Sequence, residues 1–504
     1  MKHCPKCLKT YDDQSLVFCT KDGEPLVRND KTANTVAFPA EPSIAVLPFN
    51  NFRDDPEIDY LCKGLAGELI NNLAKIVSLK VAARVSTFDL RSKGAGITEI
   101  GQALNVNFVL EGSIAKADER LRIAVELISV STSHCLWSDT YDCHIKDILE
   151  IQDQLTLAIV GALKLRLLGE EKTEAIKRHT SNVEAYKLYL KARIYFDKHT
   201  EEAWQKAIEC FEKAIAIDEE YAPAYAGLSS VLAFVWFFGS LPPDEAIPKW
   251  KMANSRALEI GDELEETHIA VGRYRFLYEW NWNETEREYQ RALELNPHNA
   301  DAHQQYGLFL ASKGRFEEAI VKGRTAVELD PRSLVVNLHL GWIYWLASRS
   351  DDVFDQVQQM LEIDSSFYAA YWQMGTTHIL TKNYEAAVDA YQKALELGGS
   401  CQVLAALGHV YGLLGKRSEA LGVIDKLLEG RKHRHTSAYN LALVYGGLRE
   451  NDEAFQWLET AYQERNGELV YVQRHAEVGV EGLWGNDFRA DARFADLLHR
   501  VGFE

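Results

Sequence analysis

Two pairs of metal-ligating residue types lie close together at the start of the chain. Cys4 and Cys7 form a C-x2-C pair, and Cys19 and Asp22 form a second pair with the same spacing. Two cysteines at this spacing turn the backbone so that both thiolates can bind one metal ion, and a second pair then completes a tetrahedral Zn²⁺ site. We therefore expect these residues to hold a structural zinc. Because the carboxylate of Asp22 binds zinc less tightly than a thiolate, His3 and a water molecule remain alternative fourth ligands.

The residues around these pairs resemble a known small domain. Eleven residues separate Cys7 from Cys19, and the phrases CPKC and FCTKDG resemble the N-terminal zinc ribbons of bacterial multidomain proteins. The resemblance implies a zinc ribbon over residues 1–30. Residues 31–42 are expected to form a linker, because Pro39 and Pro42 block regular structure. A decayed ribbon without metal is the alternative. Residues 1–32 contain six Lys or Arg and five Asp or Glu, so the segment has no basic stripe. That balance argues against nucleic-acid binding and favours a small protein-docking module.

Most of the remaining chain is periodic. A small residue recurs in similar contexts at Ala192, Ser229, Gly272, Gly307, Gly341, Gly375, Gly408 and Ala442. The last five intervals are 35, 34, 34, 33 and 34 residues, which is close to the period of the tetratricopeptide repeat (TPR). Two antiparallel helices can cross closely only where a small side chain stands, and each pair leaves an apolar face for the next repeat to bury. We predict a solenoid of about eight repeats over residues 180–466 and a capping segment over residues 467–504.

Aromatic residues at set distances from the small residues form a candidate binding surface. In TPR geometry the first helix of each repeat faces a concave groove. Positions one, four and five after the small residue should point inward. Together with a Trp three before Gly375, they select Arg273, Phe276, Trp342, Trp345, Trp372 and His409. Such a patch suits an apolar anchor from a protein or peptide partner. The alternative is that these rings fill gaps between helices as core.

The segment between the ribbon and the repeats has an α/β pattern. Short apolar or alternating runs predict strands over residues 43–49, 79–84, 108–117, 121–130 and 134–142. Helical patterns predict a helix with Leu65, Leu69, Leu73 and Ile76 on one face, and further helices over residues 97–104 and 146–168. This order predicts a mixed sheet with helices covering a face. The fold class is therefore multidomain and mainly α: a zinc ribbon, a mixed-sheet α/β domain and a TPR solenoid.

Separated phrases in this segment resemble one family in order. SIAVLPFNNF, LKVAARVSTF, IGQALNVNFVLEGSI and LRIAVELISV are similar to the TolB-N-like domain, and the similarity covers residues 43–170. That domain precedes TPR arrays in bacterial regulators, often behind an adenylate cyclase, a protein kinase or a winged-helix DNA-binding domain. The resemblance implies a non-catalytic sensing or interaction module and carries over no catalytic residue. In this sequence we expect a zinc ribbon at the place of the catalytic or DNA-binding domain.

A ligand site in the α/β segment would lie past the carboxyl ends of the first strands. Asn50, Asn51, Arg84 and Ser86 stand at that edge, where open α/β sheets bind ligands. No glycine-rich phosphate loop follows either strand, so no nucleotide is expected. An ordinary polar loop rim is the alternative, and no small-molecule ligand is evident from the sequence.

Composition restricts the class of protein. The chain has 504 residues, a net charge of −19 and eight Cys. The acidic charge repels phosphate backbones and anionic membranes, and the cysteine content indicates a reducing compartment rather than a disulfide framework. No apolar run is long enough to span a membrane, and no signal peptide is recognisable, so we expect a cytoplasmic protein. P-loop, H-E-x-x-H, G-x-S-x-G and H-R-D motifs are absent, so we expect no enzyme.

These observations predict a bacterial scaffold or adaptor that acts in signalling or regulation and holds a protein partner in the TPR groove. The alternative is a ligand-sensing signalling or transcription regulator. In that interpretation the TolB-N-like domain is the sensor, and the ribbon contacts nucleic acid or an enzyme supplied in trans.

Overall fold

A computed structural model of the chain describes residues 2–3, 10–11, 27–28, 42–51, 56–76, 78–163, 165, 178–198, 200–237, 241, 243–433, 436–479 and 483–503. The chain divides into two compact units, residues 1–40 and 41–504. The first contains β1 (Lys2–His3), β2 (Thr10–Tyr11) and β3 (Val27–Arg28), paired antiparallel in the order β2-β1-β3. The predicted ligands Cys4, Cys7, Cys19 and Asp22 lie outside the described residues, so the zinc site stays a prediction.

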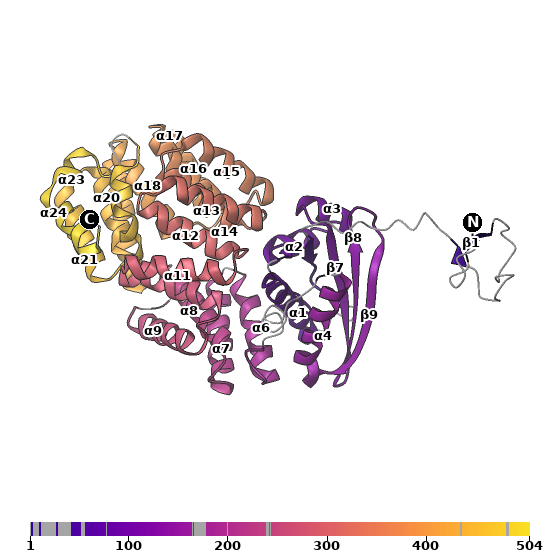
Figure 1. Cartoon of the computed structure of the whole chain (residues 1–504). Helices are drawn as coiled ribbons and strands as arrows, with labels where there is room; N and C mark the ends of the chain where they lie inside the picture. The colour runs from indigo at the N-terminus through magenta and orange to yellow at the C-terminus, as the bar shows by residue number, and fades with distance from the viewer. Residues whose placement is uncertain are drawn as a thin grey trace. The chain divides into compact units, whose positions relative to one another are not determined.

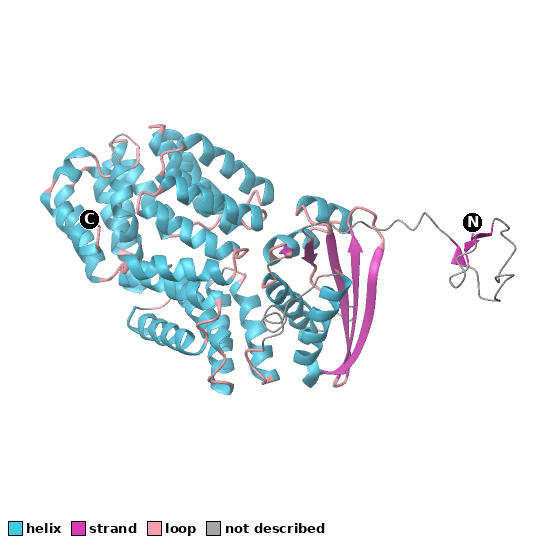
Figure 2. Ribbon diagram, viewed as in Figure 1, coloured by secondary structure: helices cyan, strands magenta, loops and turns pink. Residues whose placement is uncertain are grey.

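The second unit begins with a mixed sheet and its helices (Figure 2). Its elements in chain order are β4 (Ser43–Val46), β5 (Asn50–Asn51), α1 (Pro56–Ala74), β6 (Lys80–Val81), α2 (Arg84–Ser92), α3 (Ile97–Ala103), β7 (Phe108–Ala117), β8 (Arg120–Ser129), β9 (Cys135–His144) and α4 (Ile148–Ala162). The strand order is β6-β4-β7-β8-β9, and β5 also pairs with β7. Pairing is parallel among β6, β4 and β7 and antiparallel from β7 to β9. The predicted mixed sheet is confirmed.

The apolar face predicted for α1 is buried. Leu65, Leu69 and Leu73 are fully inaccessible to solvent. The prediction is wrong over residues 79–84, because the strand is only Lys80–Val81 and Arg84 begins the helix α2. The buried face of α2 consists of Ser86, Thr87 and Leu90. A helix whose buried side is mostly hydroxyl has no apolar period to read from the sequence.

The rest of the unit is a helical array (Figure 1). Its helices are α6 (Val183–Phe196), α7 (Glu201–Ile217), α8 (Ala222–Phe237), α9 (Pro243–Ile260), α10 (Glu265–Tyr274), α11 (Trp282–Leu295), α12 (Ala300–Ser312), α13 (Phe316–Leu329), α14 (Leu334–Leu346), α15 (Ser350–Ile363), α16 (Tyr368–Leu380), α17 (Tyr384–Glu396), α18 (Cys401–Leu413), α19 (Arg417–His433), α20 (Ala438–Leu448) and α21 (Asn451–Gln463). Eight helix pairs are thus described, and a π-helical turn, Arg275–Glu279, extends α10.

The recurring small residues lie at helix crossings, as the packing argument requires. A Cβ atom built on Gly375 would lie 2.7 Å from the ring of Tyr391, and one on Gly272 would lie 2.7 Å from the ring of Tyr289. Both tyrosines come from the second helix of the same repeat and are completely buried. A larger side chain at either glycine would therefore force the two helices apart.

The chain after α21 forms a tail with two parts. Gly467–Tyr471 is a 3-10 turn that runs into α22 (Val472–Glu477), and then come α23 (Asn486–Ala490) and α24 (Ala492–Val501). Phe494 and Leu497 of α24 are buried, and α24 packs on α21, the last helix of the array. The other part of the tail, residues 467–479, instead contacts earlier repeats of the array.

Candidate partner-binding groove and domain junction

A tryptophan pair connects the first helices of two neighbouring repeats. Trp342 on α14 and Trp372 on α16 are both half-buried. Their ring centroids lie 5.1 Å apart in an edge-to-face arrangement, and the ring of Trp345 lies 5.7 Å from that of Trp342. Edge-to-face contacts hold aromatic rings in fixed orientations. Trp342 and Trp372 therefore present a rigid apolar surface that retains exposed area.

The other aromatic residues selected for the groove are buried in the array. Phe276, Trp345 and His409 are at most 3% exposed. The indole Nε1 of Trp345 donates to the backbone oxygen of Thr376 at 3.2 Å. His409 Nδ1 lies 2.9 Å from the backbone oxygen of Leu443, and burial lowers the pKa of this imidazole to about 4. These three side chains therefore lie in the helical core, which is the alternative to a position in the groove.

Arg273 is buried as well, but it keeps its charge paired across the repeats. Its guanidinium on α10 donates to the carboxylate of Asp301 on α12 at 3.2 Å. Arg273 is 6% exposed, whereas the side chain of Asp301 is 48% exposed. The pair therefore offers a partner the carboxylate of Asp301 rather than the positive charge of Arg273.

The tail covers two of the aromatic residues predicted to bind a partner. The ring of Tyr471 packs edge-on against Phe276 at 5.9 Å, and the ring of His475 packs edge-on against Trp345 at 5.6 Å. Burial lowers the pKa of His475 to about 4, so the imidazole that contacts Trp345 is neutral. Sequence reasoning missed Tyr471 and His475, because they follow the last repeat and carry no period of their own.

Hydrogen bonds fix the tail along the same edge of the array. Arg474 Nε donates to the backbone oxygen of Ser312 at 3.2 Å, and the backbone nitrogen of Gly479 donates to Ser348 Oγ at 3.0 Å. Ser312 ends α12 and Ser348 follows α14. Residues 467–479 thus lie across the carboxyl ends of the first helices of successive repeats. They leave the Trp342–Trp372 pair half-exposed.

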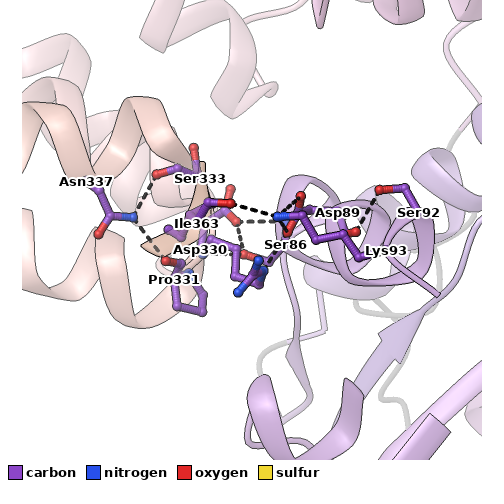
Figure 3. A network of polar contacts seen from close by, with 10 residues as sticks. Ser86, Asp89, Ser92, Lys93, Asp330, Pro331, Ser333, Asn337 and Ile363 are labelled. Atoms are coloured by element: carbon purple, nitrogen blue, oxygen red, sulfur yellow. Dashed lines mark hydrogen bonds and ion pairs between the residues drawn. The ribbon is translucent and has the colours of Figure 1, made fainter. Parts of the chain in front are cut away.

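The α/β domain is attached to the array by a buried polar contact (Figure 3). The backbone nitrogen of Ser86 on α2 donates to the carboxylate of Asp330 at 3.1 Å, and Ser86 Oγ donates to the same carboxylate oxygen. The backbone nitrogen of Arg332 donates to Ser86 Oγ at 2.8 Å, and Arg332 Nε donates to Asp89 at 2.6 Å. Burial raises the pKa of Asp330 to about 6, and the hydrogen bonds from Ser86 oppose that rise.

Contacts at α1 and α6 complete the attachment. Arg193 Nη1 on α6 donates to Glu68 on α1 at 3.1 Å, and Arg84 Nη2 donates to Asp197 at 2.9 Å. The structure therefore uses Arg84 and Ser86 to hold the array rather than to line an open site past the strand ends. Asn50 and Asn51 lie in β5, which pairs with β7.

Comparison with protein families identifies two kinds of segment. Residues 40–158 match the model of the second domain of HilA/YgeH-like transcriptional regulators. Residues 288–321 and 368–397 match models of the tetratricopeptide repeat. The chain therefore contains TPRs, as the period predicts, preceded by a domain similar to part of a transcriptional regulator. The TolB-N-like resemblance stays a prediction.

Curated relatives cover parts of the chain. A Rhizobium meliloti (strain 1021) protein named "Putative adenylate cyclase 3" is 36% identical over 193 residues, which is 38% of this chain and 33% of that protein. BBSome complex member BBS4 of Bos taurus is 28% identical over 234 residues, which is 45% of this chain and 43% of that protein. The chain thus spans between a third and a half of the length of these relatives.

Among solved structures, the APC/C hetero-tetramer Cut9-Hcn1 is 17% identical and covers 71% of this chain and 62% of its own, with a TM-score of 0.41. The TPR protein YrrB is 21% identical and covers 38% of this chain and 93% of its own, with a TM-score of 0.26.

Within the described part of the chain, no three His, Cys, Asp or Glu side chains converge as a metal site. Nor does any described helix have the length and apolar character needed to cross a membrane.

Proposed function

We propose that this protein is a non-catalytic regulatory adaptor that binds a protein or peptide partner through its TPR array. TPR solenoids act through extended binding surfaces built from consecutive repeats. The observation that carries the proposal is the pair Trp342 and Trp372, because it joins two repeats and stays half-exposed while neighbouring aromatic residues are covered. Rigid tryptophan rings of this kind are common anchors in protein interfaces.

The α/β domain and the ribbon give the adaptor further contact surfaces. The polar contacts from Ser86 to Asp330 and from Arg193 to Glu68 tie the α/β domain to the array, so a partner bound to one is held at a fixed place relative to the other. We further propose that Cys4, Cys7, Cys19 and Asp22 hold a structural zinc.

The test is co-purification of partners with the tagged full-length protein from its own cells after mild crosslinking. The double variant Trp342→Ala/Trp372→Ala should recover the specific partner at least tenfold less than the wild type, because a buried interface tryptophan contributes roughly 2 kcal/mol or more. Trp457→Ala is the matched control, since Trp457 is a half-buried tryptophan on the second helix α21. Equal partner recovery from the double variant and the wild type would rule out the tryptophan pair as the binding surface.

A second candidate function is regulation of transcription or signalling, with the α/β domain as sensor and the ribbon contacting nucleic acid or an enzyme in trans. The match of residues 40–158 to a transcriptional-regulator domain favours it. The same experiment separates the two candidates. Nucleic acid that co-purifies equally with the wild type and the double variant, with no protein lost from the variant, supports the regulator.

A further inference from the structure

A cavity opens where two helices of the α/β domain meet the first repeats of the array. Its volume is about 50 Å³, and it is partly open to solvent. Its walls come from α1 and α4 on one side and from α6, α10 and the residues before α8 on the other. None of the residues selected for the partner groove lines it, so a role for this cavity is independent of the adaptor proposal.

The charges around this cavity do not balance. Four carboxylates line it, those of Glu68, Asp153, Glu265 and Glu266. Two cations, Lys75 and Arg178, also line it, and Arg193 of α6 approaches Glu68 and Glu266. Four carboxyl groups and three cations leave one carboxyl group without a matching cation among these described residues.

Glu265 and Glu266 are the two carboxylates without a close cation, and Glu265 accepts a hydrogen bond from the amide of Asn296 at 2.9 Å. Arg193 Nη1 lies 3.1 Å from Glu68 but 3.9 Å from Glu266, whereas Asp153 has its own cation, Arg178, at 2.6 Å. Glu266 keeps 33% of its side chain exposed. Burial, followed by repulsion from Glu265, raises the pKa of Glu266. Burial and repulsion thus outweigh the attraction of Arg193 and Lys75, which lower this pKa.

Two buried polar side chains also face the cavity without a partner. Asn72 is 6% exposed and Tyr221 is 3% exposed, and both line the cavity. The amide of Asn72 and the hydroxyl of Tyr221 make no hydrogen bond to another described side chain or backbone group. Both side chains can therefore exchange hydrogen bonds with a molecule in the cavity.

We propose that this cavity binds a small alkylammonium ion, that is, a primary amine in its protonated form. One ammonium group supplies the missing positive charge and three N–H donors. The carboxylate of Glu266, the hydroxyl oxygen of Tyr221 and the amide oxygen of Asn72 are acceptors on the wall. The rings of Tyr186 and Tyr189 line the same cavity and give the alkyl group and its charge an aromatic surface. An inorganic cation would leave those apolar walls unused.

The experiment uses the full-length protein and ethylammonium chloride as the probe. Binding is followed by calorimetric titration and by the shift in melting temperature, against potassium chloride at equal ionic strength. Ethylammonium should bind saturably and raise the melting temperature more than potassium does. Glu266→Gln should weaken binding at least tenfold, because charge-assisted hydrogen bonds are the strong ones. Tyr221→Phe, which removes a single oxygen, should weaken it by roughly threefold to tenfold.

Glu294→Gln is the matched control, since Glu294 is an exposed carboxylate paired with Arg291 on α11. It should bind ethylammonium like the wild type. Equal effects of potassium and ethylammonium, an unchanged affinity in both Glu266→Gln and Tyr221→Phe, or the absence of any saturable effect would each overturn the proposal. Because each variant is compared with and without probe, a change in its intrinsic stability does not affect the interpretation. Trp342→Ala/Trp372→Ala should keep the ammonium affinity, which separates this test from that of the adaptor.

Discussion

Asp330 and Asp364 occupy the same position in consecutive repeats, 34 residues apart, but the structure places them in opposite environments. Asp330 is 5% exposed beneath α2, and burial raises its pKa to about 6. Asp364 accepts hydrogen bonds from the Oγ and backbone nitrogen of Ser366 at the surface, and these lower its pKa. A single repeat position thus carries opposite pH dependence, because the α/β domain covers only the first of the two carboxylates.

Asp330→Asn should therefore change stability in a pH-dependent way. In the wild type the neutral form of Asp330 is favoured by folding, so its contribution is fully present below the ordinary pKa of 3.8 and is lost as pH rises through about 6. The asparagine side chain stays neutral at every pH and still offers an oxygen that accepts from Ser86. Urea unfolding should show the variant equal to the wild type near pH 4 and more stable above pH 6, by up to roughly 3 kcal/mol for a shift of about two pKa units.

Asp364→Asn provides the control with the opposite sign. The lowered pKa of Asp364 means that its carboxylate stabilises the fold above the ordinary pKa of 3.8 and that this contribution is lost as pH falls through the lower folded-state value. The variant should be less stable than the wild type at neutral pH and approach it in acid. A stability difference for Asp330→Asn that stays constant from pH 4 to pH 8 would contradict the proposed cause.

At the scale of elements, the repeat period predicts helix pairing but not the path of the tail. The recurring small residues locate the crossings of α10 with α11 and of α16 with α17, because steric exclusion at a crossing is local in sequence. The return of residues 467–479 to α12 and α14 depends on contacts more than 100 residues apart, such as Arg474 with Ser312. No period encodes such contacts. For the same reason the sequence could select Phe276 and Trp345 but could not show that the tail covers them.

In the α/β domain, too, an element with a local apolar pattern was predictable from the sequence, and an element held by distant contacts was not. The alternating run of β8 was predictable because one face of the strand is apolar: Leu121, Ile123 and Val125 are buried on a single side. The helix α2 was not predictable, because Ser86 and Thr87 on its buried face find their partners in a distant repeat or in the helix itself. Likewise, the cavity beside Glu266 combines side chains from several separate segments, none of which is a motif alone.

Releasing the tail tests its role as an element. Tyr471→Ala removes the ring that packs on Phe276, and we expect the free energy of unfolding to fall by roughly 2 kcal/mol because a half-buried aromatic contact is lost. Hydrogen–deuterium exchange should speed up over residues 467–479 and at the carboxyl end of α12. Arg489→Ala on α23 is the control, since Arg489 is not buried and bonds to Asn486 in its own helix. Unchanged exchange over residues 467–479 in Tyr471→Ala would show that this ring does not hold the tail.

At the scale of the whole molecule, the division into residues 1–40 and 41–504 separates two sources of stability. The second unit has a core of buried apolar residues that extends from Phe276 to Phe503. A segment of 40 residues has too few apolar side chains to form a comparable core and needs another source of stability, such as a bound metal. The proposed zinc on Cys4, Cys7, Cys19 and Asp22 would supply it. Removing such a metal should affect the first unit and leave the second folded.

The purified protein should therefore contain about one zinc ion per chain, as measured by elemental analysis. The variant Cys4→Ser/Cys7→Ser should contain less than about a tenth as much zinc, because two of the thiolate ligands are gone. Chelation should remove the zinc while the main thermal transition, which reports the core of residues 41–504, keeps its midpoint. Cys62→Ser is the matched control: Cys62 is a buried free thiol in α1, and the variant should keep its zinc. Zinc-free wild-type protein, or equal zinc in the Cys4→Ser/Cys7→Ser variant, would exclude the ribbon site. Asp22→Ala then identifies the fourth ligand, since zinc affinity falls in this variant only if the carboxylate of Asp22 binds the metal.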